Sequence, residues 1–166
     1  MSEALTTEDL KPTLRVAAAS GAKHSTDLVR SGMDGFLGYH LRLAYLSISR
    51  HFAKAMAPVD LTQKQLGVLW LIGANGGVSQ IAIARELGMD RASMMAIVDR
   101  LQDRSLVLRE RSRHDGRRQE LYLTPQGRKL LAKARSIIVK HELWMTERFG
   151  EGETAALIEM LRRMHR

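Results

Sequence analysis

A ten-residue segment from Arg109 to Arg118 carries five arginines and two acidic residues. A short strand is predicted on each side: Leu106 to Leu108 lead into the segment, and Gln119 to Thr124, in which Leu121 and Leu123 alternate with Tyr122, follow it. Asp115-Gly116 is a typical turn of a β-hairpin. The pattern predicts a hairpin with an arginine-rich tip. Because that tip has no core to join, its charge must face solvent or a polyanion.

Two short helices are predicted directly upstream of the hairpin. Ser79 precedes a helix from Gln80 to Leu87, and Asp90 precedes a helix from Arg91 to about Arg104. Ser and Asp are preferred caps of helix N-termini. Only Gly88 and Met89 separate the two helices, which is typical of a helix-turn-helix whose second helix enters the major groove of DNA. The hairpin that follows would be its wing.

Longer helices are predicted on both sides of this unit. Apolar residues at helical spacing predict a first helix from Phe36 to Pro58, and Thr62 with Gln65 forms a capping box for a second helix that ends near Ala74. Thr124-Pro125 starts a fifth helix through about Phe149, and a sixth covers Glu153 to Met164. The fold class is therefore mainly α with a small β-wing, and residues 1–32 read as a flexible arm.

Composition narrows the function. The chain has 166 residues, a formal net charge of +8, a pI near 10.3 and no cysteine. The charge favours nucleic acid or another anionic partner, and the missing thiols exclude disulfides and cysteine zinc sites. The six histidines lack metal-ligand spacing, and no glycine-rich phosphate loop is present, so we expect neither an enzyme nor a cofactor. No apolar run is long enough to span a bilayer and no signal peptide is evident, so a cytoplasmic location is expected.

The helix after Asp90 has two unlike faces. Met94, Ile97, Val98 and Leu101 form an apolar stripe that should pack on the core. The opposite face carries small residues between two arginines, which suits either a DNA groove or a plain solvated surface. In the wing, arginines can enter a narrow minor groove or bind phosphates, and Asp115 can bond the turn or brace Arg117. The candidate DNA-binding residues are Ser79, Gln80, Arg91, Ala92, Ser93, Met95, Arg100, Arg113, Asp115, Arg117 and Arg118.

From Gly35 to Arg166 the chain resembles the MarR family of transcriptional regulators. The resemblance rests on three ordered elements: Val78 to Asp90, then Ile97-Val98-Asp99-Arg100-Leu101, and finally Asp115-Gly116-Arg117-Arg118 followed by Leu123-Thr124-Pro125-Gln126-Gly127. It implies a single domain over residues 33–166. Residues 33–60 and 125–166 would be dimerisation helices, and residues 61–124 the DNA-binding lobe. It also implies a homodimer on a pseudo-palindromic DNA operator.

Members of this family are usually repressors that a small ligand releases from DNA, often an aromatic carboxylate. The opening Gly35 to His40 resembles members that respond to aromatic acids or their coenzyme A thioesters. The ligand would lie between the dimerisation helices and the DNA-binding lobe. Candidate contacts are side chains with an apolar face, many with a polar handle, although each is also an ordinary core residue: Tyr39, His40, Leu43, Phe52, Leu69, Trp70, His141 and Trp144.

Other functions stay open at this point. A nonspecific architectural DNA-binding protein would show the same charge, and a regulator could respond to a different class of ligand. RNA-binding modules usually use aromatic stacking platforms, whereas aromatic residues make up 5% of this chain and none lies in the arginine-rich tip of the hairpin or in the helix after Asp90. Activation instead of repression would depend on where the operator lies relative to a promoter.

Overall fold

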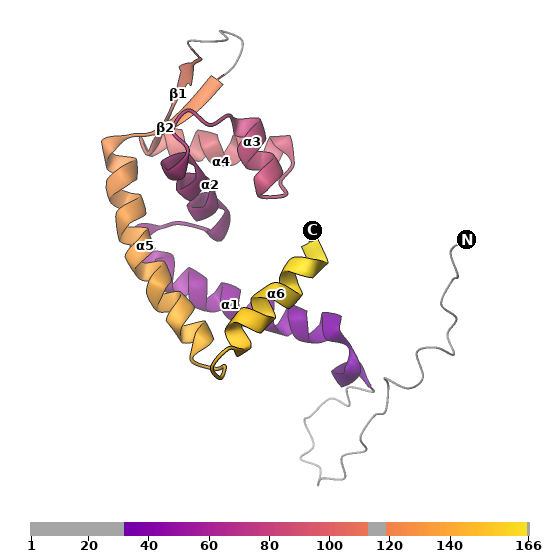
Figure 1. Ribbon diagram of the computed structural model, residues 1–166. Helices are drawn as coiled ribbons and strands as arrows, with labels where there is room; N and C mark the ends of the chain where they lie inside the picture. The colour runs from indigo at the N-terminus through magenta and orange to yellow at the C-terminus, as the bar shows by residue number, and fades with distance from the viewer. Residues whose placement is uncertain (1–31, 113–118, 166) are drawn as a thin grey trace, which may run out of the picture. The chain divides into compact units, whose positions relative to one another are not determined.

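The structure is a computed structural model that describes residues 32–112 and 119–165 (Figure 1). The expected N-terminal arm lies almost wholly outside the described residues, as does the tip of the wing. The contacts divide the chain into two units, residues 1–47 and 48–166. The boundary falls within the first long helix, and the expected division into dimerisation helices and a DNA-binding lobe stays a prediction.

The described part of unit 1 is helical. A short 3₁₀ turn, η1 (Met33–Gly35), precedes α1 (Leu37–Met56), which begins one residue later than predicted and ends two residues earlier. In unit 2 the end of α1 runs into a second 3₁₀ turn, η2 (Ala57–Val59), which contains Pro58. A helix tolerates proline in its first turn but not in its interior. Pro58 therefore explains why α1 ends at Met56.

The remaining helices begin where their caps predict. The capping box of Thr62 and Gln65 starts α2 (Gln63–Ala74), Ser79 starts α3 (Gln80–Glu86) and Asp90 starts α4 (Arg91–Asp103). Thr124 starts α5 (Pro125–Thr146), and α6 (Glu153–His165) closes the described chain. α5 ends three residues before the predicted end at about Phe149, since the chain leaves the helix after Thr146.

The hairpin is present, but its first strand is longer than predicted. β1 (Val107–Arg111) pairs antiparallel with β2 (Gln119–Leu123), with Val107 opposite Leu123 and Arg111 opposite Gln119. Arg109, Glu110 and Arg111 therefore belong to the strand and not to the tip. Val78 adds a bridge on the other side of β2: the N–H of Leu121 donates to its carbonyl over 3.0 Å.

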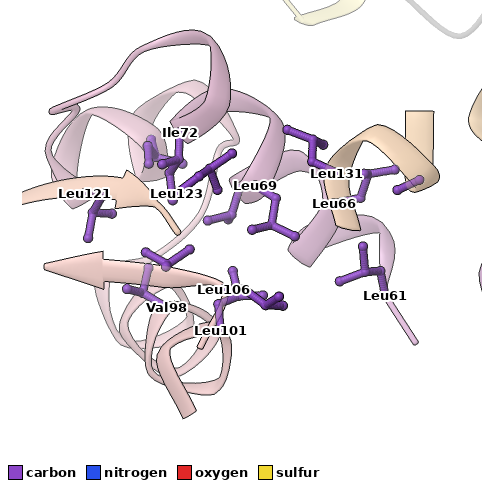
Figure 2. Close-up of a cluster of buried hydrophobic side chains, with 14 of the residues drawn as sticks. Leu61, Leu66, Leu69, Ile72, Val98, Leu101, Leu106, Leu121, Leu123 and Leu131 are labelled. Carbon is purple, nitrogen blue, oxygen red and sulfur yellow. The ribbon is translucent and has the colours of Figure 1, made fainter. Parts of the chain in front are cut away.

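The core of unit 2 joins α2, α4, α5 and the hairpin (Figure 2). Leu69, Ile72, Val98, Leu101 and Leu121 are at most 1% exposed. The family-like Leu-Thr-x-x-Gly start of α5 has a structural reason here. The Thr124 hydroxyl accepts from the N–H of Gly127 over 2.9 Å, and a side chain at Gly127 would collide with the carbonyl of Leu106. The glycine therefore lets α5 begin directly against the strand that leads into the wing.

Candidate DNA-binding surface

A tight turn joins α3 to α4. Gly88 adopts a φ of 59°, in the left-handed region that glycine enters without strain, and the N–H of Met89 donates to the carbonyl of Ala84 over 2.8 Å. The Ser79 hydroxyl accepts from the N–H of Ala82 over 3.2 Å at the start of α3. The two helices thus form the predicted helix-turn-helix, and the Ser79 side chain already serves as its first cap.

The start of α4 is fixed by Asp90. Its carboxylate accepts from the N–H of Ser93 over 2.8 Å. The hydrogen bonds from the side chain and then the main chain of Ser93 are the main reason that the pKa of Asp90 lies below its usual value. The cap at the start of α4 therefore favours the ionised carboxylate of Asp90.

The two faces of α4 are separated as predicted. Met94, Val98 and Leu101 are 0% exposed, and Ile97 packs partly buried on the same core. The opposite face is open: Met95 is 53% exposed, and Arg91, Ala92, Ala96 and Arg100 are exposed as well. A row of small side chains between two arginines lets a helix backbone approach base edges closely. Gln80, at the start of α3, is half-buried.

The wing is tied to α4 by an ion pair that the sequence reading missed. Nη2 of Arg109 in β1 donates to the Asp99 carboxylate in α4 over 2.6 Å. The Asp99 side chain is 47% exposed and that of Arg109 22% exposed. Asp99 lies in the motif Ile97-Val98-Asp99-Arg100-Leu101, but its position on the helix does not show that its partner lies ten residues further along the chain. The pair joins β1 to α4.

The candidate wing contacts lie outside the described residues. Arg113, Asp115, Arg117 and Arg118 all belong to the segment 113–118. Their roles in DNA binding stay predictions from the sequence. The described strands end at Arg111 and begin again at Gln119, both exposed.

Three of the eight candidate ligand residues meet in unit 2, together with a histidine that the sequence reading did not select. His51 of α1 and His141 of α5 approach with their Nδ1 atoms 2.7 Å apart, so one ring donates to the other. Trp144 stacks on His51 with the ring centroids 3.8 Å apart, and Phe52 meets His141 edge-on at 5.6 Å. His141 is 2% exposed. Burial and then the nearby His51 lower the pKa of His141, and Glu142 acts in the opposite direction.

The other candidate ligand residues lie elsewhere. Leu69 is fully buried in the core, and Trp70 is 38% exposed beneath the guanidinium of Arg135 at 4.5 Å. Tyr39, His40 and Leu43 belong to unit 1, where Nε2 of His40 lies 2.7 Å from the carbonyl oxygen of Asp34.

Two surface pockets lie in unit 2. One, of about 300 Å³, lies at the end of α1 and is lined by Phe52, Met56, Leu61 and polar neighbours that include Ser49. The other, of about 570 Å³, lies beside the hairpin and the start of α5, and none of the candidate ligand residues lines it.

Within residues 32–112 and 119–165 no three His, Asp or Glu side chains gather as a metal site would require. No helix of this described part has the length and apolar character needed to cross a membrane.

Comparisons with known proteins agree with this geometry. Residues 59–118 match the model of the MarR family. A putative transcriptional regulatory protein for the hcr operon of Thauera aromatica is 33% identical over 141 residues, which cover 84% of this chain and 85% of that protein. The chain belongs to the MarR family. The HosA transcriptional regulator of Escherichia coli O157:H7 is 30% identical over 105 residues, or 63% of this chain and 78% of HosA.

Solved structures of a MarR-like repressor match over nearly their whole length. The transcriptional repressor CouR bound to a 23-mer DNA duplex is 38% identical with a TM-score of 0.81, and the match covers 85% of this chain and 100% of CouR. CouR bound to p-coumaroyl-CoA is 37% identical with a TM-score of 0.78, covering 84% and 99%. This MarR protein is therefore a transcriptional regulator with a winged helix-turn-helix fold, and the expected fold class is confirmed.

Proposed function

We propose that this MarR regulator is a homodimeric repressor that binds a specific double-stranded operator and is released by an aromatic acid or its coenzyme A thioester. The observation that carries the proposal is the exposed face of α4, where Arg91 and Arg100 frame small side chains on a helix that the core and its cap hold in place. Its relative CouR has been solved on a DNA duplex, which supports DNA as the partner.

Dimerisation is supported by apolar surface that the described chain leaves uncovered. Leu143 and Phe149 are 53% and 42% exposed, and Leu161 and Met164 of α6 are 37% and 60% exposed. Large apolar side chains left exposed on α5, on α6 and between them are typical of a protein interface. A two-fold dimer would present two copies of α4 to half-sites about one helical turn of DNA apart.

The aromatic effector is supported by one relative and one cluster. CouR has been solved with p-coumaroyl-CoA. In this chain Phe52, His141 and Trp144 offer flat apolar rings and ring nitrogens, and Phe52 also lines the pocket of about 300 Å³ at the end of α1. An aromatic ring suits such surroundings. We assign these three residues the leading part among the candidate effector contacts, which also include Tyr39, His40, Leu43, Leu69 and Trp70.

A binding experiment tests the proposal. Full-length protein is titrated into the DNA upstream of its own gene and into unrelated DNA of the same length, at several salt concentrations. We expect specific binding that weakens steeply with salt, because contacts to phosphates release counterions from the DNA and added salt reduces that gain. Aromatic acids and their coenzyme A thioesters, added singly, should release the protein. The Arg117→Ala variant should bind more weakly with a shallower salt dependence, and Arg162→Ala, on α6, is the matched loss of charge.

The competing function gives a different result. A nonspecific architectural protein would bind both DNAs with similar affinity and would ignore every aromatic compound. Specific binding that no aromatic compound relieves would keep the operator-binding regulator and replace the effector with another class of ligand.

A further inference from the structure

The two ends of the recognition helix α4 are held by different kinds of contact. Its N-terminal end is fixed locally, by the Asp90 cap and by the turn at Gly88. Its C-terminal end is fixed to a distant part of the chain through Arg104, the residue that caps α4. Nη1 of Arg104 donates to the carbonyl of Asp60 over 2.5 Å, and Nη2 donates to the carbonyl of Val59 over 3.1 Å. The guanidinium therefore grips two successive main-chain carbonyls at the end of η2.

The gripped turn is itself well fixed. Asp60 ends η2 with a φ of 49°, and its N–H donates to the carbonyls of Met56 and Ala57 over 3.0 and 3.2 Å. Carbonyls at the C-terminal end of a helical turn lack an internal partner and carry partial negative charge, so a cation is stabilised there. The planar fork of arginine matches two neighbouring acceptors better than the single ammonium of lysine does.

The Asp60 carboxylate adds little to this grip. It lies 3.6 Å from Nη1 of Arg104 and its side chain is 93% exposed, whereas the Arg104 side chain is 32% exposed. Exposed ion pairs contribute little because water and salt screen them. The main-chain carbonyls, which no side-chain substitution removes, are the acceptors that define the direction of the guanidinium.

The main chain at the same point is bound to the start of α5. The carbonyl of Arg104 accepts from Nε2 of Gln126 over 3.4 Å, and the next carbonyl, of Ser105, accepts from the Thr124 hydroxyl over 2.7 Å. The C-terminal end of α4 is thus joined to the end of η2 through one side chain and to the start of α5 through the main chain. α5 leads on to Leu143, which belongs to the surface that we propose as the dimer interface.

We propose that Arg104 is a positioning residue for DNA recognition, one that sets the tilt of α4 and thereby the half-site spacing that the dimer accepts. The inference rests on the proposed dimeric function. Apolar packing of Met94, Val98 and Leu101 holds α4 against the core but does not fix its orientation, since the hydrophobic effect depends on buried area and not on angle. Hydrogen bonds depend on angle, so the grip of Arg104 resists rotation of the helix end.

Spacing-variant operators test this role. An operator is first selected with full-length wild-type protein from random duplexes, and its two half-sites are then separated by one or two base pairs more or fewer. Each change moves and rotates one half-site relative to the other. The wild type should bind one spacing roughly tenfold or more tightly than the others, a difference of the size that one mismatched base pair produces. Arg104→Met should bind that spacing about tenfold more weakly and discriminate less than about threefold between spacings.

Two further variants separate the grip from charge and from folding. Arg104→Lys keeps the charge, but its single ammonium cannot match two neighbouring carbonyls as the planar guanidinium does. Its spacing profile should therefore lie between those of the wild type and Arg104→Met. Asp60→Asn keeps both carbonyls and tolerates the left-handed backbone, so its profile should match the wild type. Circular dichroism melting identifies a variant that does not fold, and Arg104→Lys carries the test if Arg104→Met is such a variant.

The alternatives give distinct outcomes. An equal loss of affinity at every spacing, with a shallower salt dependence, would make Arg104 a phosphate contact and overturn the positioning role. An unchanged profile in both Arg104 variants would overturn it too. A wild type that selects no operator, or that selects one without spacing preference, would overturn the proposed dimeric function and the inference with it.

Discussion

Helices α4 and α6 have the same length, 13 residues, but differ in how far their apolar side chains are buried. α4 buries Met94, Val98 and Leu101 completely within its own chain. α6 has no buried residue in the described chain, and Leu161 and Met164 stay 37% and 60% exposed. The difference separates two kinds of stability. The core beneath α4 is complete within one chain, whereas α6 leaves an apolar face that the described residues do not cover, as the proposed dimer requires.

The largest effect is expected in the lobe. Leu101→Ala removes a fully buried side chain and should lower the free energy of unfolding by about 2–5 kcal/mol, since a cavity remains. Met95→Ala on the exposed face of the same helix is the control and should change it by less than about 0.5 kcal/mol. Urea unfolding followed by circular dichroism measures both. Equal effects of the two substitutions would contradict the assignment of faces on α4.

A second substitution should act on assembly. Leu161→Asp places a charge on the exposed face of α6 and should weaken the proposed dimer by about 2 kcal/mol or more, the size of a hot-spot loss. Sedimentation velocity over a range of concentrations would show the shift to monomer. Glu159→Ala, which breaks only an exposed ion pair with Arg162, should leave the dimer intact. An intact Leu161→Asp dimer would mean that α6 is not part of the interface.

A smaller effect is expected where the wing meets α4. Asp99→Asn and Arg109→Met each break the 2.6 Å ion pair. Because both side chains are partly exposed, a double-mutant cycle should give a coupling of about 0.5–1 kcal/mol in stability. Operator affinity should fall in both single variants, since the wing loses its fixed direction. A cycle with no coupling in either measurement would show that the pair does not hold the wing.

The smallest effect is a pH dependence from the buried His141. The pKa of His141 is lowered by burial, so below about pH 6.5, the usual value for histidine, the unfolded chain binds more protons than the folded chain. Stability should therefore be complete above that pH and decline as the pH falls toward the lowered value. Thermal unfolding at several pH values measures the slope, which His141→Phe should reduce. An equal slope in that variant would assign the dependence to other groups.

Local signals in the sequence were sufficient for the elements that make the site. The caps at Thr62, Ser79, Asp90 and Thr124 all start helices, because a cap depends on residues three positions apart. The separation of α4 into a buried and an exposed face also follows from helical spacing alone.

Contacts between distant residues were beyond such signals. The Asp99–Arg109 pair and the grip of Arg104 on Val59 and Asp60 depend on where separate elements meet in the fold. The candidate effector set shows the same limit: it contained Phe52, His141 and Trp144, but not His51, whose Nδ1 lies 2.7 Å from Nδ1 of His141. An apolar face with a polar handle identifies suitable residue types, whereas contacts between α1 and α5 decide which of them meet.

The hairpin also has a consequence for behaviour in solution. β2 is paired on both sides, by β1 and by Val78, whereas the described chain places no strand along the outer side of β1. An open strand edge is a template for association between molecules, and alternating charges discourage it. Arg109, Glu110 and Arg111 occupy that edge strand. The same residues that lead to the wing would therefore keep concentrated protein from aggregating through its strands whenever DNA is absent.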